Sequence, residues 1–448
     1  MVNSILLILS KIKKNIDWIF WISLLFLVFT GIVSIYSASS NYSDPTKFIT
    51  TQIIALLLGF AFAGLFASFN YQHYKHFNVI IYILSCLLLI SVLFFGSTIN
   101  GTKGWFKIWH FSMQPVELTK IMFVLVLATF LDGKWKEIEK FSTFTKALLL
   151  MLGHIFLIML QPDFSSTIPY YPITLAMLYV AGVKLRYLLS VMLYGALAVG
   201  IPLLITFIKL QPEVLYSSKI LTFIVAASSS IKIFLLVLAV LVIVVFTIKW
   251  FLNKLRINLP VIYPIIFLAI VIAGSFSSVI VEKSLKEYQR KRLIVFLKPE
   301  IDSRGSGYNI IQSKITIGSG KILGKSFFNG TQTQLGFLPE QRTDFIFAVI
   351  GEEGGYLISQ LTILFYFLLV WRAMRIAKNS RDRYGSLVAS GIATMFAFYG
   401  IINIGMVTGL MPATGLPLMF VSYGGSSLVS AMICVGILLS IHIRRFQE

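Results

Sequence analysis

The chain has 448 residues, of which 57% are hydrophobic, 14% are aromatic and only 12% are charged. Its mean hydropathy of +0.86 lies far above that of a soluble globular domain, and its apolar content far above that of a disordered chain. This composition excludes a water-soluble enzyme and an intrinsically disordered protein. The formal net charge of +20 would indicate nucleic-acid binding in a soluble protein, but membrane proteins collect Lys and Arg in cytoplasmic loops. No nucleic-acid partner is therefore expected.

Apolar runs recur along the chain at the length of about 20 residues that an α-helix needs to cross a bilayer. The first run follows three lysines and is too long for a signal-peptide core, so we expect it to be retained as a transmembrane helix. The second half of the stretch between residues 187 and 250 has few polar residues to mark where helices end, so the sequence is compatible with ten or with twelve helices. The predicted helices cover residues 18–38, 48–69, 78–95, 115–131, 147–160, 164–182, 187–208, 231–250, 260–281, 346–371, 386–406 and 420–441.

The distribution of lysine and arginine among the loops predicts the orientation of these helices. If the N-terminus lies inside, the inside loops collect most of the basic residues, whereas the last outside loop, residues 407–419, has no charge. Cytoplasmic loops of membrane proteins are enriched in Lys and Arg. We therefore expect a multi-pass protein, one membrane domain over residues 1–448, with both termini in the cytoplasm.

One long segment, residues 282–344, departs from the membrane pattern because it is polar, charged and rich in glycine. The predicted topology places it on the outer face. Loops longer than about 12 to 15 residues are usually functional or disordered, and the apolar pairs Ile310-Ile311 and Phe327-Phe328 favour an ordered loop. We expect the active region to lie here.

Three carboxylates follow one another at the end of this loop. Asp344 lies where the loop becomes a helix, so that it and Thr343 could simply be N-cap residues, which favour Asp and Thr. A chemical role for Asp344 is the alternative. Glu352 and Glu353 lie about two helical turns deeper, where ionisable groups usually face a polar cavity or a partner.

Basic residues offer candidate partners for these carboxylates or for an anionic substrate. Glu117 and Lys120 are spaced i, i+3 and can pair inside the membrane, either as a structural ion pair or with the cation near a substrate. Lys314, Lys325 and Arg342 could bind phosphate or be solvated. The five histidines lack metal-ligand spacing, so no metal site is predicted. Common nucleotide-binding and hydrolase motifs are absent, so ATP hydrolysis and the common hydrolase chemistries lack support. A transporter and a lipid-handling enzyme both fit these features.

Four motifs in the chain resemble the SEDS family (shape, elongation, division and sporulation). They are residues 114–120, which include Gln114; the turn Gln161-Pro162-Asp163; residues 339–353; and residues 415–427, which include Gly424, Gly425 and Ser426. The resemblance runs in order across nearly the whole chain, and residues 307–320 and 330–335 are more similar to the elongation branch than to the division branch. It implies an all-α polytopic bundle of about ten core helices. Residues 209–258 would then be an inserted helical hairpin, giving about twelve helices in total.

The resemblance also implies an activity, that of a peptidoglycan glycosyltransferase polymerising lipid II, an undecaprenyl-diphosphate-linked disaccharide peptide. The reaction would take place at the outer face of the bacterial cytoplasmic membrane during cell elongation. Asp344 matches the catalytic aspartate, and a carboxylate there can accept the proton of the acceptor 4-hydroxyl. Cations must balance the diphosphate. The supporting residues would be Gln114, Glu117, Lys120, Lys314, Lys325, Arg342, Glu352 and Glu353, and the structural motif residues Gln161, Pro162, Asp163, Gly424, Gly425 and Ser426.

The implied partners are a class B penicillin-binding protein and other membrane proteins of the elongation complex. No cofactor is certain, although a divalent cation is possible. Three alternatives stay open at this point: a division glycosyltransferase, a lipid II flippase, and a non-catalytic scaffold for the penicillin-binding protein. The carboxylate at the junction of loop and helix distinguishes the enzymes from the other two.

Overall fold

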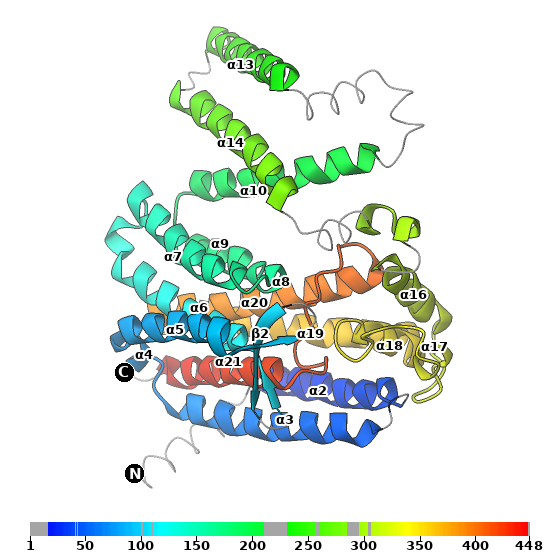
Figure 1. Cartoon of the computed structure of the whole chain (residues 1–448). Coiled ribbons are helices and arrows are strands. Elements are labelled where there is room, and N and C mark those ends of the chain that lie inside the picture. Colours follow the sequence, from blue (N-terminus) through cyan, green and yellow to red (C-terminus); the bar gives the residue numbers. More distant parts are fainter. Residues whose placement is uncertain are drawn as a thin grey trace. The chain divides into compact units, whose positions relative to one another are not determined.

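The computed structural model describes residues 17–40, 42, 44–99, 102–108, 111–209, 231–256, 260–284, 295–302 and 306–446 (Figure 1). The chain divides into two compact units, one formed by Met1–Val183 with Asn309–Glu448 and the other by Lys184–Tyr308. Eight helices in the described residues are long and apolar enough to cross a membrane. The prediction of a helical, polytopic membrane protein is confirmed. These eight are α2 (Trp18–Ala38), α3 (Pro45–Ser68), α5 (Asn78–Phe95), α7 (Phe141–Met159), α10 (Leu185–Lys209), α19 (Gly355–Lys378), α20 (Arg383–Thr408) and α21 (Gly425–Ile443).

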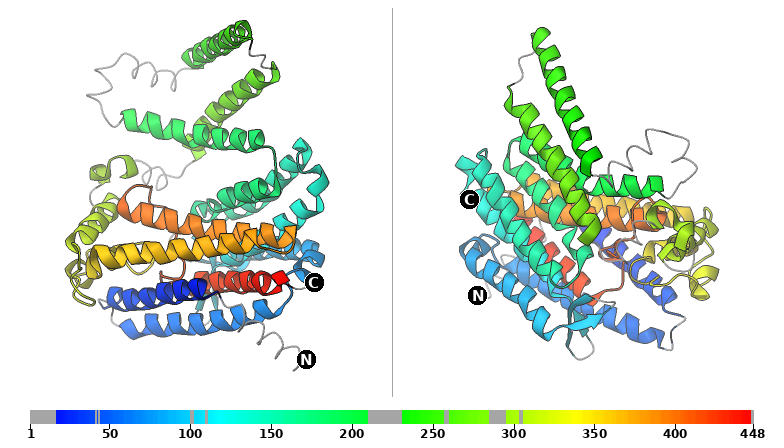
Figure 2. Two further views of the ribbon diagram at one scale, coloured as in Figure 1. Left: turned by 180° about the vertical axis from the view of Figure 1, so that it is seen from behind. Right: turned by 45° about the horizontal axis from the view of Figure 1, so that its top comes forward.

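The larger unit is built around helices that other helices surround. In α20 and α21, 72% and 83% of the most apolar window is buried, against 17% in α5 and 22% in α3. Both views place α21 between α3 and α20 (Figure 1, Figure 2). The remaining described helices of this unit are α4 (His73–His76), α6 (Pro115–Gly133), η1 (Trp135–Glu137), α8 (Phe164–Thr167), α9 (Tyr170–Ala181), most of α16 (Ser306–Ser319), α17 (Thr331–Gln334), α18 (Ile346–Glu353) and η3 (Arg444–Phe446).

A small antiparallel sheet, which the apolar periodicity did not reveal, precedes α6. Its strands are β1 (Ser97–Ile99), β2 (Thr102–Ile108) and β3 (Phe111–Met113), in the order β1-β2-β3. The chain then enters α6 through Gln114 and Pro115, and proline suits the first helical position because its missing N–H has no helical partner there. The sheet therefore fixes where the Gln114 motif begins.

The run over residues 346–371 does not form one helix, contrary to the prediction. The chain breaks between α18 and α19, where Gly355 adopts a φ of +63°. A Cβ at Gly355 would lie 2.2 Å from the backbone nitrogen of Gly324, so the loop packs directly on the break. Hydropathy alone misses this break because both helices are apolar, and only glycine readily takes this backbone conformation.

Basic side chains join the helix ends at one end of the larger unit. Arg372 pairs with Asp17 at 2.5 Å, and Arg444 donates to the carbonyl of Ser68 at 2.7 Å. Lys75 also pairs with Asp132, and Arg383 donates to the carbonyl of Ala181. The loop between α16 and α18 lies at the opposite end (Figure 1). This separation is what the predicted inside and outside loops require.

The smaller unit contains α10, α13 (Ile231–Lys254), α14 (Ile262–Ser284) and η2 (Pro299–Asp302). Helices α10 and α14 pack closely, since a Cβ at Gly274 would lie 2.9 Å from the Cβ of Leu197. The predicted hairpin over residues 209–258 includes α13, but residues 210–230 and 257–259 lie outside the described residues. The hairpin therefore stays a prediction. The predicted loop over residues 282–344 contains η2, α16 and α17 in its described part.

Helix α2 approaches the segment before α21 through a glycine, which gives a test of this packing. A Cβ at Gly31 would lie 2.6 Å from the carbonyl oxygen and 2.8 Å from the Cα of Val421. We predict that Gly31→Ala lowers the free energy of unfolding by about 1 to 3 kcal/mol, because backbone must move to admit the methyl group. Thermal unfolding of the purified protein in detergent measures this.

The matched control is Gly64→Ala in α3, where the added Cβ has no neighbour within 4 Å. Alanine there should leave the protein equally stable or slightly more stable, because alanine favours helix. Equal unfolding temperatures for the two variants would contradict the close packing at Gly31.

Candidate functional site

Asp344 lies in a turn before α18 and is not the N-cap of that helix, so the capping prediction for Thr343 and Asp344 is wrong. The N-cap position is Phe345, which has no side-chain capping bond. The turn is closed by its own backbone instead, with the N–H groups of Thr343 and Phe345 donating to the carbonyl of Glu340 at 3.2 and 3.3 Å. Capping therefore does not account for a carboxylate at residue 344.

The backbone around Asp344 is held by the segment that precedes α21. The amide of Asn403 on α20 donates to the carbonyl of Asp344 and to that of Leu416, both at 2.8 Å. Ser422 Oγ donates to the carbonyl of Thr343 at 2.6 Å, and the N–H of Tyr423 donates to that of Arg342 at 2.9 Å. Three consecutive carbonyls are thus fixed, which gives the half-buried Asp344 side chain a defined origin.

Arg342 is enclosed by aromatic rings. Its guanidinium carbon lies 4.1 Å from the ring centroid of Tyr42, 4.0 Å from that of Phe48 and 5.9 Å from that of Tyr423. A guanidinium stacks well on such rings because it is planar and weakly hydrated. The rings therefore hold Arg342 in place near Asp344, while its buried Nη1 has no hydrogen-bond partner among the described residues. Its phosphate-binding role stays a prediction.

Glu352 is wholly buried and serves as a common acceptor for the loop. Its carboxylate pairs with Lys325 at 2.7 Å and accepts the N–H groups of Gln332 and Thr333 at 2.9 Å each. Burial alone would raise the pKa of Glu352, but these hydrogen bonds hold the pKa below its usual value. Because Lys325 is paired in this way, its charge is already balanced within the protein.

Glu353 is also buried and faces the end of α2. Ser37 Oγ donates to its carboxylate, and Gln334 Nε2 donates to Ser37 Oγ at 3.0 Å. The expectation that both glutamates face a partner is therefore confirmed. Together they tie the loop to α2 and α18.

The predicted pair of Glu117 and Lys120 forms in the centre of the bundle. Lys120 Nζ lies 2.7 Å from Glu117 Oε1, and neither side chain is more than 7% exposed. Lys120 also donates to the hydroxyl of Tyr399 on α20. Tyr399 and Asn403 are spaced i, i+4 and so share one face of α20. The same face of α20 therefore contacts Lys120 at one point and the Asp344 turn at the next.

The two motifs at residues 114 and 161 meet in space. Gln114 Nε2 donates to Asp163 Oδ2 at 2.9 Å, and Asp163 also caps α8 by accepting the N–H of Ser166 at 3.1 Å. Gln161 Nε2 donates to the carbonyl of Leu89 at 3.0 Å. Pro162 lies in the turn between Gln161 and Asp163. This confirms the turn and adds a structural reason for both motifs.

Lys314 remains an exposed cation on α16. Its side chain lies over Gly409, where a Cβ would come within 2.6 Å of Lys314 Nζ, and Ser313 bonds α16 to the carbonyl of Val407 at 2.8 Å. At the start of α21, the N–H of Gly424 donates to Gln52 Oε1 at 3.2 Å. The motif Gly424, Gly425 and Ser426 thus forms the helix start, with Ser426 buried.

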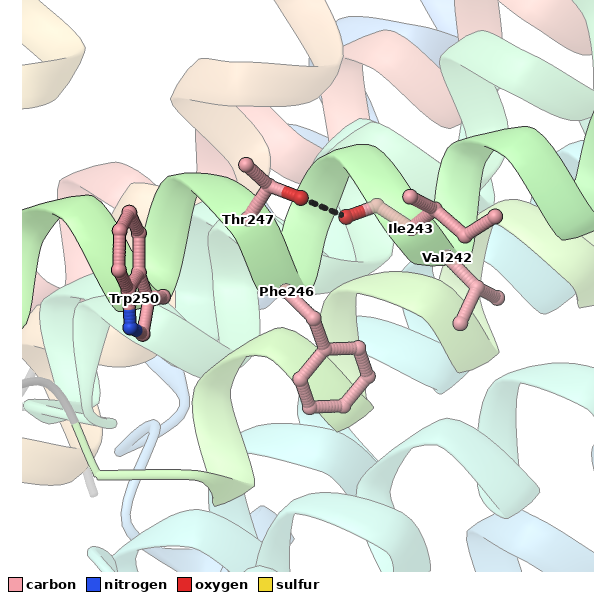
Figure 3. Close-up of a pocket in the computed structure, with 5 residues that line it drawn as sticks. All are labelled: Val242, Ile243, Phe246, Thr247 and Trp250. Carbon is pink, nitrogen blue, oxygen red and sulfur yellow. Dashed lines mark hydrogen bonds between the residues drawn. The ribbon is translucent and has the colours of Figure 1, made fainter.

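The pocket on α13 is apolar, and the described residues offer no metal site. A shallow apolar hollow lies on α13 and offers little polar chemistry (Figure 3). Among the described residues, no three His, Cys, Asp or Glu side chains are grouped so that they could hold a metal ion. The hollow is lined by Val242, Ile243, Phe246, Thr247 and Trp250.

Comparisons with known proteins decide the family. The family model of the cell cycle proteins FtsW, RodA and SpoVE matches residues 17–224 and 214–447. The chain is 33% identical to the peptidoglycan glycosyltransferase RodA of Treponema pallidum over 96% of this chain and 98% of that protein. The chain belongs to the FtsW, RodA and SpoVE family.

Two further relatives and two solved structures agree with this membership. The probable peptidoglycan glycosyltransferase FtsW of Trichlorobacter lovleyi is 32% identical, covering 92% of this chain and 89% of its own, and the peptidoglycan glycosyltransferase MrdB of Escherichia coli K12 is 30% identical, covering 97% and 95%. A peptidoglycan synthase complex has a chain with the same fold at a TM-score of 0.67 and 24% identity, covering 96% and 99%. The Thermus thermophilus rod shape determining protein RodA matches with a TM-score of 0.59 and 22% sequence identity, covering 96% of this chain and 98% of its own. The resemblance seen in the sequence motifs is confirmed.

Sequence reasoning missed the neutral residues that hold this family site together. Asn403 and Tyr399 lie within an apolar helix and carry no charge, so hydropathy gave no signal for them. Ser422 and Tyr423 lie inside the motif at residues 415–427, which was the only signal for their role. Gln52 is a buried polar residue in α3, and its depth in an apolar run was a usable clue.

The buried pair can be tested by removing one partner and then both. Lys120→Met should lower the free energy of unfolding by about 3 to 5 kcal/mol, because Glu117 is then left buried and unpaired. The double variant with Glu117→Gln should recover most of that loss. Thermal unfolding of the two single variants and the double variant in detergent checks this, and strictly additive losses would contradict the pairing.

The aromatic enclosure of Arg342 predicts that lysine cannot replace it. Arg342→Lys should reduce glycan polymerisation, because an ammonium stacks less well than a planar guanidinium and the turn beside Asp344 loosens. The matched control is Arg375→Lys, since Arg375 also lies over an aromatic ring, that of Trp371 at 5.4 Å. Arg375 lies in the last turn of α19, at the end away from the Asp344 turn. Equal activity of both variants would show that the stacking does not position the turn.

Proposed function

We propose that Asp344 is the general base with which this chain, a peptidoglycan glycosyltransferase, polymerises lipid II. The observation that carries the proposal is the turn whose carbonyls at Arg342, Thr343 and Asp344 are each held by a hydrogen bond. A general base must lie within hydrogen-bond reach of the proton that it removes, so its backbone must be held in a fixed position. Relatives named peptidoglycan glycosyltransferase support the activity.

The proposed reaction is a single displacement. The 4-hydroxyl oxygen of the acceptor sugar attacks the anomeric carbon of the donor while the Asp344 carboxylate accepts the hydroxyl proton. The bond from the anomeric carbon to the lipid diphosphate breaks, and the diphosphate leaves with the electron pair. An α-linked donor then gives a β-linked glycan, because one displacement inverts the anomeric centre.

Cations near the turn would balance the charge on the departing diphosphate. Lys314 is exposed and has no ion pair among the described residues, which makes it the better candidate. Lys120 is buried in an ion pair with Glu117, so it would act on the diphosphate without direct contact. Lys325 is paired with Glu352, whereas Arg342 is stacked between aromatic rings with its Nη1 unpartnered among the described residues. A divalent cation stays a prediction, which adding a chelator to the polymerisation assay would test.

The proposed orientation places both termini in the cytoplasm and Asp344 at the outer face of the membrane. The basic residues at one end of the larger unit support it, because Lys and Arg mark cytoplasmic loops. We further propose a class B penicillin-binding protein and other elongation proteins as partners. The fold shared with a chain of a peptidoglycan synthase complex supports such a partner. The identity to RodA favours elongation, and FtsW-like division is the alternative.

The assignment of Asp344 predicts loss of polymer in a near-isosteric variant. Asp344→Asn should abolish glycan formation from lipid II by the purified complex with the penicillin-binding protein, because the amide cannot accept the proton. Gel analysis of labelled glycan measures this, at matched unfolding temperature and complex yield.

The matched control is Glu340→Gln, which changes an exposed carboxylate of the same turn. It should keep most of the activity. Full polymerisation by Asp344→Asn would overturn the base assignment. No polymer from the wild-type protein in a working assay would favour a flippase or a scaffold.

A further inference from the structure

The loop between α16 and α17 carries two apolar side chains that are largely exposed among the described residues. Ile322 is 65% exposed and Leu323 is 77% exposed, and the preceding Lys321 is also exposed. Two adjacent aliphatic side chains at such exposure are costly in water, since apolar surface is favoured in an apolar environment. The surroundings of this turn, residues 321–323, indicate what covers it.

The turn forms one piece with the first turn of α19. The N–H of Tyr356 donates to the carbonyl of Lys321 at 2.9 Å, and the N–H of Leu357 donates to that of Ile322 at 3.2 Å. The first N–H groups of a helix have no partner within the helix, and here the turn supplies the acceptors. The turn therefore cannot move away from the end of α19 without breaking these bonds.

The apolar side chains of the turn continue the exposed face of that helix. Leu357, Leu361 and Leu364 are 49%, 42% and 48% exposed and are spaced i, i+4, i+7, which places them on one stripe. Helix α19 is among those that are long and apolar enough to span a membrane, and this stripe is its exposed apolar face. Ile322 and Leu323 add exposed apolar side chains at the N-terminus of the same helix, where the turn is bonded to it.

The polar residues beside the stripe are those that suit the surface of a bilayer. Tyr356 is 60% exposed at the first turn of α19, and tyrosine is enriched at membrane interfaces. Lysine can keep its ammonium at the lipid phosphates while its stem lies along apolar surface, as Lys321 could here.

We propose that residues 321–323 insert into the interfacial region of the lipid bilayer at this end of α19. Ile322 and Leu323 lie among the upper acyl chains, and the Lys321 ammonium lies at the lipid phosphates. The turn lies at the end of a helix long enough to span a membrane, and the exposed Tyr356 and Lys321 beside it are residue types that suit a bilayer surface, which favours lipid over a protein as the occupant. This inference rests on the membrane-spanning fold and not on the proposed chemistry of Asp344.

Residues 324 and 325, which follow the turn, pack on the end of α18. Two residues after the turn, the N–H of Lys325 donates to the carbonyl of Glu352 at 3.0 Å, and a Cβ at Gly324 would lie 2.0 Å from the carbonyl oxygen of Glu353. The turn is thus packed on the end of α18, the helix that follows Asp344. Lipid contact at residues 321–323 would hold this part of the loop at the membrane surface.

The test places a fluorescent probe whose emission reports polarity at residue 323. Cys86 and Cys434 are first replaced by serine and alanine, and Leu323→Cys is labelled in the full-length protein in nanodiscs of phosphatidylethanolamine and phosphatidylglycerol. Leu361→Cys is the lipid reference and Asn379→Cys, exposed beyond the other end of α19, is the water reference. We expect blue-shifted emission that is quenched by lipids brominated near the headgroup more strongly than by iodide.

A second probe at Ile322→Cys guards against a local effect of one substitution, and both residues are exposed enough to be replaced without unfolding the chain. Emission and iodide quenching like those at Asn379 would overturn the proposal. A blue shift that arises only after the penicillin-binding protein is added would overturn it as well, since a protein would then be the occupant. Loss of polymerisation does not enter this test, so a failure of the Asp344 assignment would leave its outcome unchanged.

Discussion

The side-chain amide of Asn403 is the contact on which the site depends most. A turn outside a regular helix exposes backbone carbonyls, and inside a membrane protein these must find donors because lipid offers none. Asn403 supplies two, one to the Asp344 turn and one to Leu416. Two segments that lie about seventy residues apart in sequence are thereby joined on one residue of α20.

The same helix connects this turn to the buried ion pair. Tyr399 lies one helical turn from Asn403 and contacts Lys120, which belongs to the motif at residues 114–120. Charges in a low-dielectric interior are stable only when they are paired and hydrogen-bonded, which Glu117 and Tyr399 achieve for Lys120. A rigid α20 therefore fixes the separation between a buried cation and a carboxylate on the loop side. Pre-organised charge of this kind needs no rearrangement when negative charge develops on a leaving group.

Hydropathy predicted some helix bounds well, but the expected helix at residues 164–182 is divided at Pro169 into α8 and α9. The expected helices at residues 18–38 and 78–95 coincide with α2 and α5, because Asp17 and Gly96 mark ends that a periodicity argument can see. The break at Gly355 was not predicted, since it follows from a positive φ and from packing against Gly324. Likewise the charges of Lys325 and Arg342 were visible in the sequence, but their partners were not, because Glu352 and the three aromatic rings come from distant parts of the chain.

The arrangement of the loop suits the lipid-linked substrate that we propose. A donor anchored in the bilayer brings its diphosphate to a fixed depth, so a base and a cation serve it only if they are held at that depth too. The Asp344 turn is fixed from the bundle side by α20 and the segment before α21, while Glu352 and Glu353 fix the loop to α18 and α2. Two sets of contacts thus define the depth of one short turn. A loop held only by its own ends could not do so, because closing so long a segment leaves its middle unconstrained.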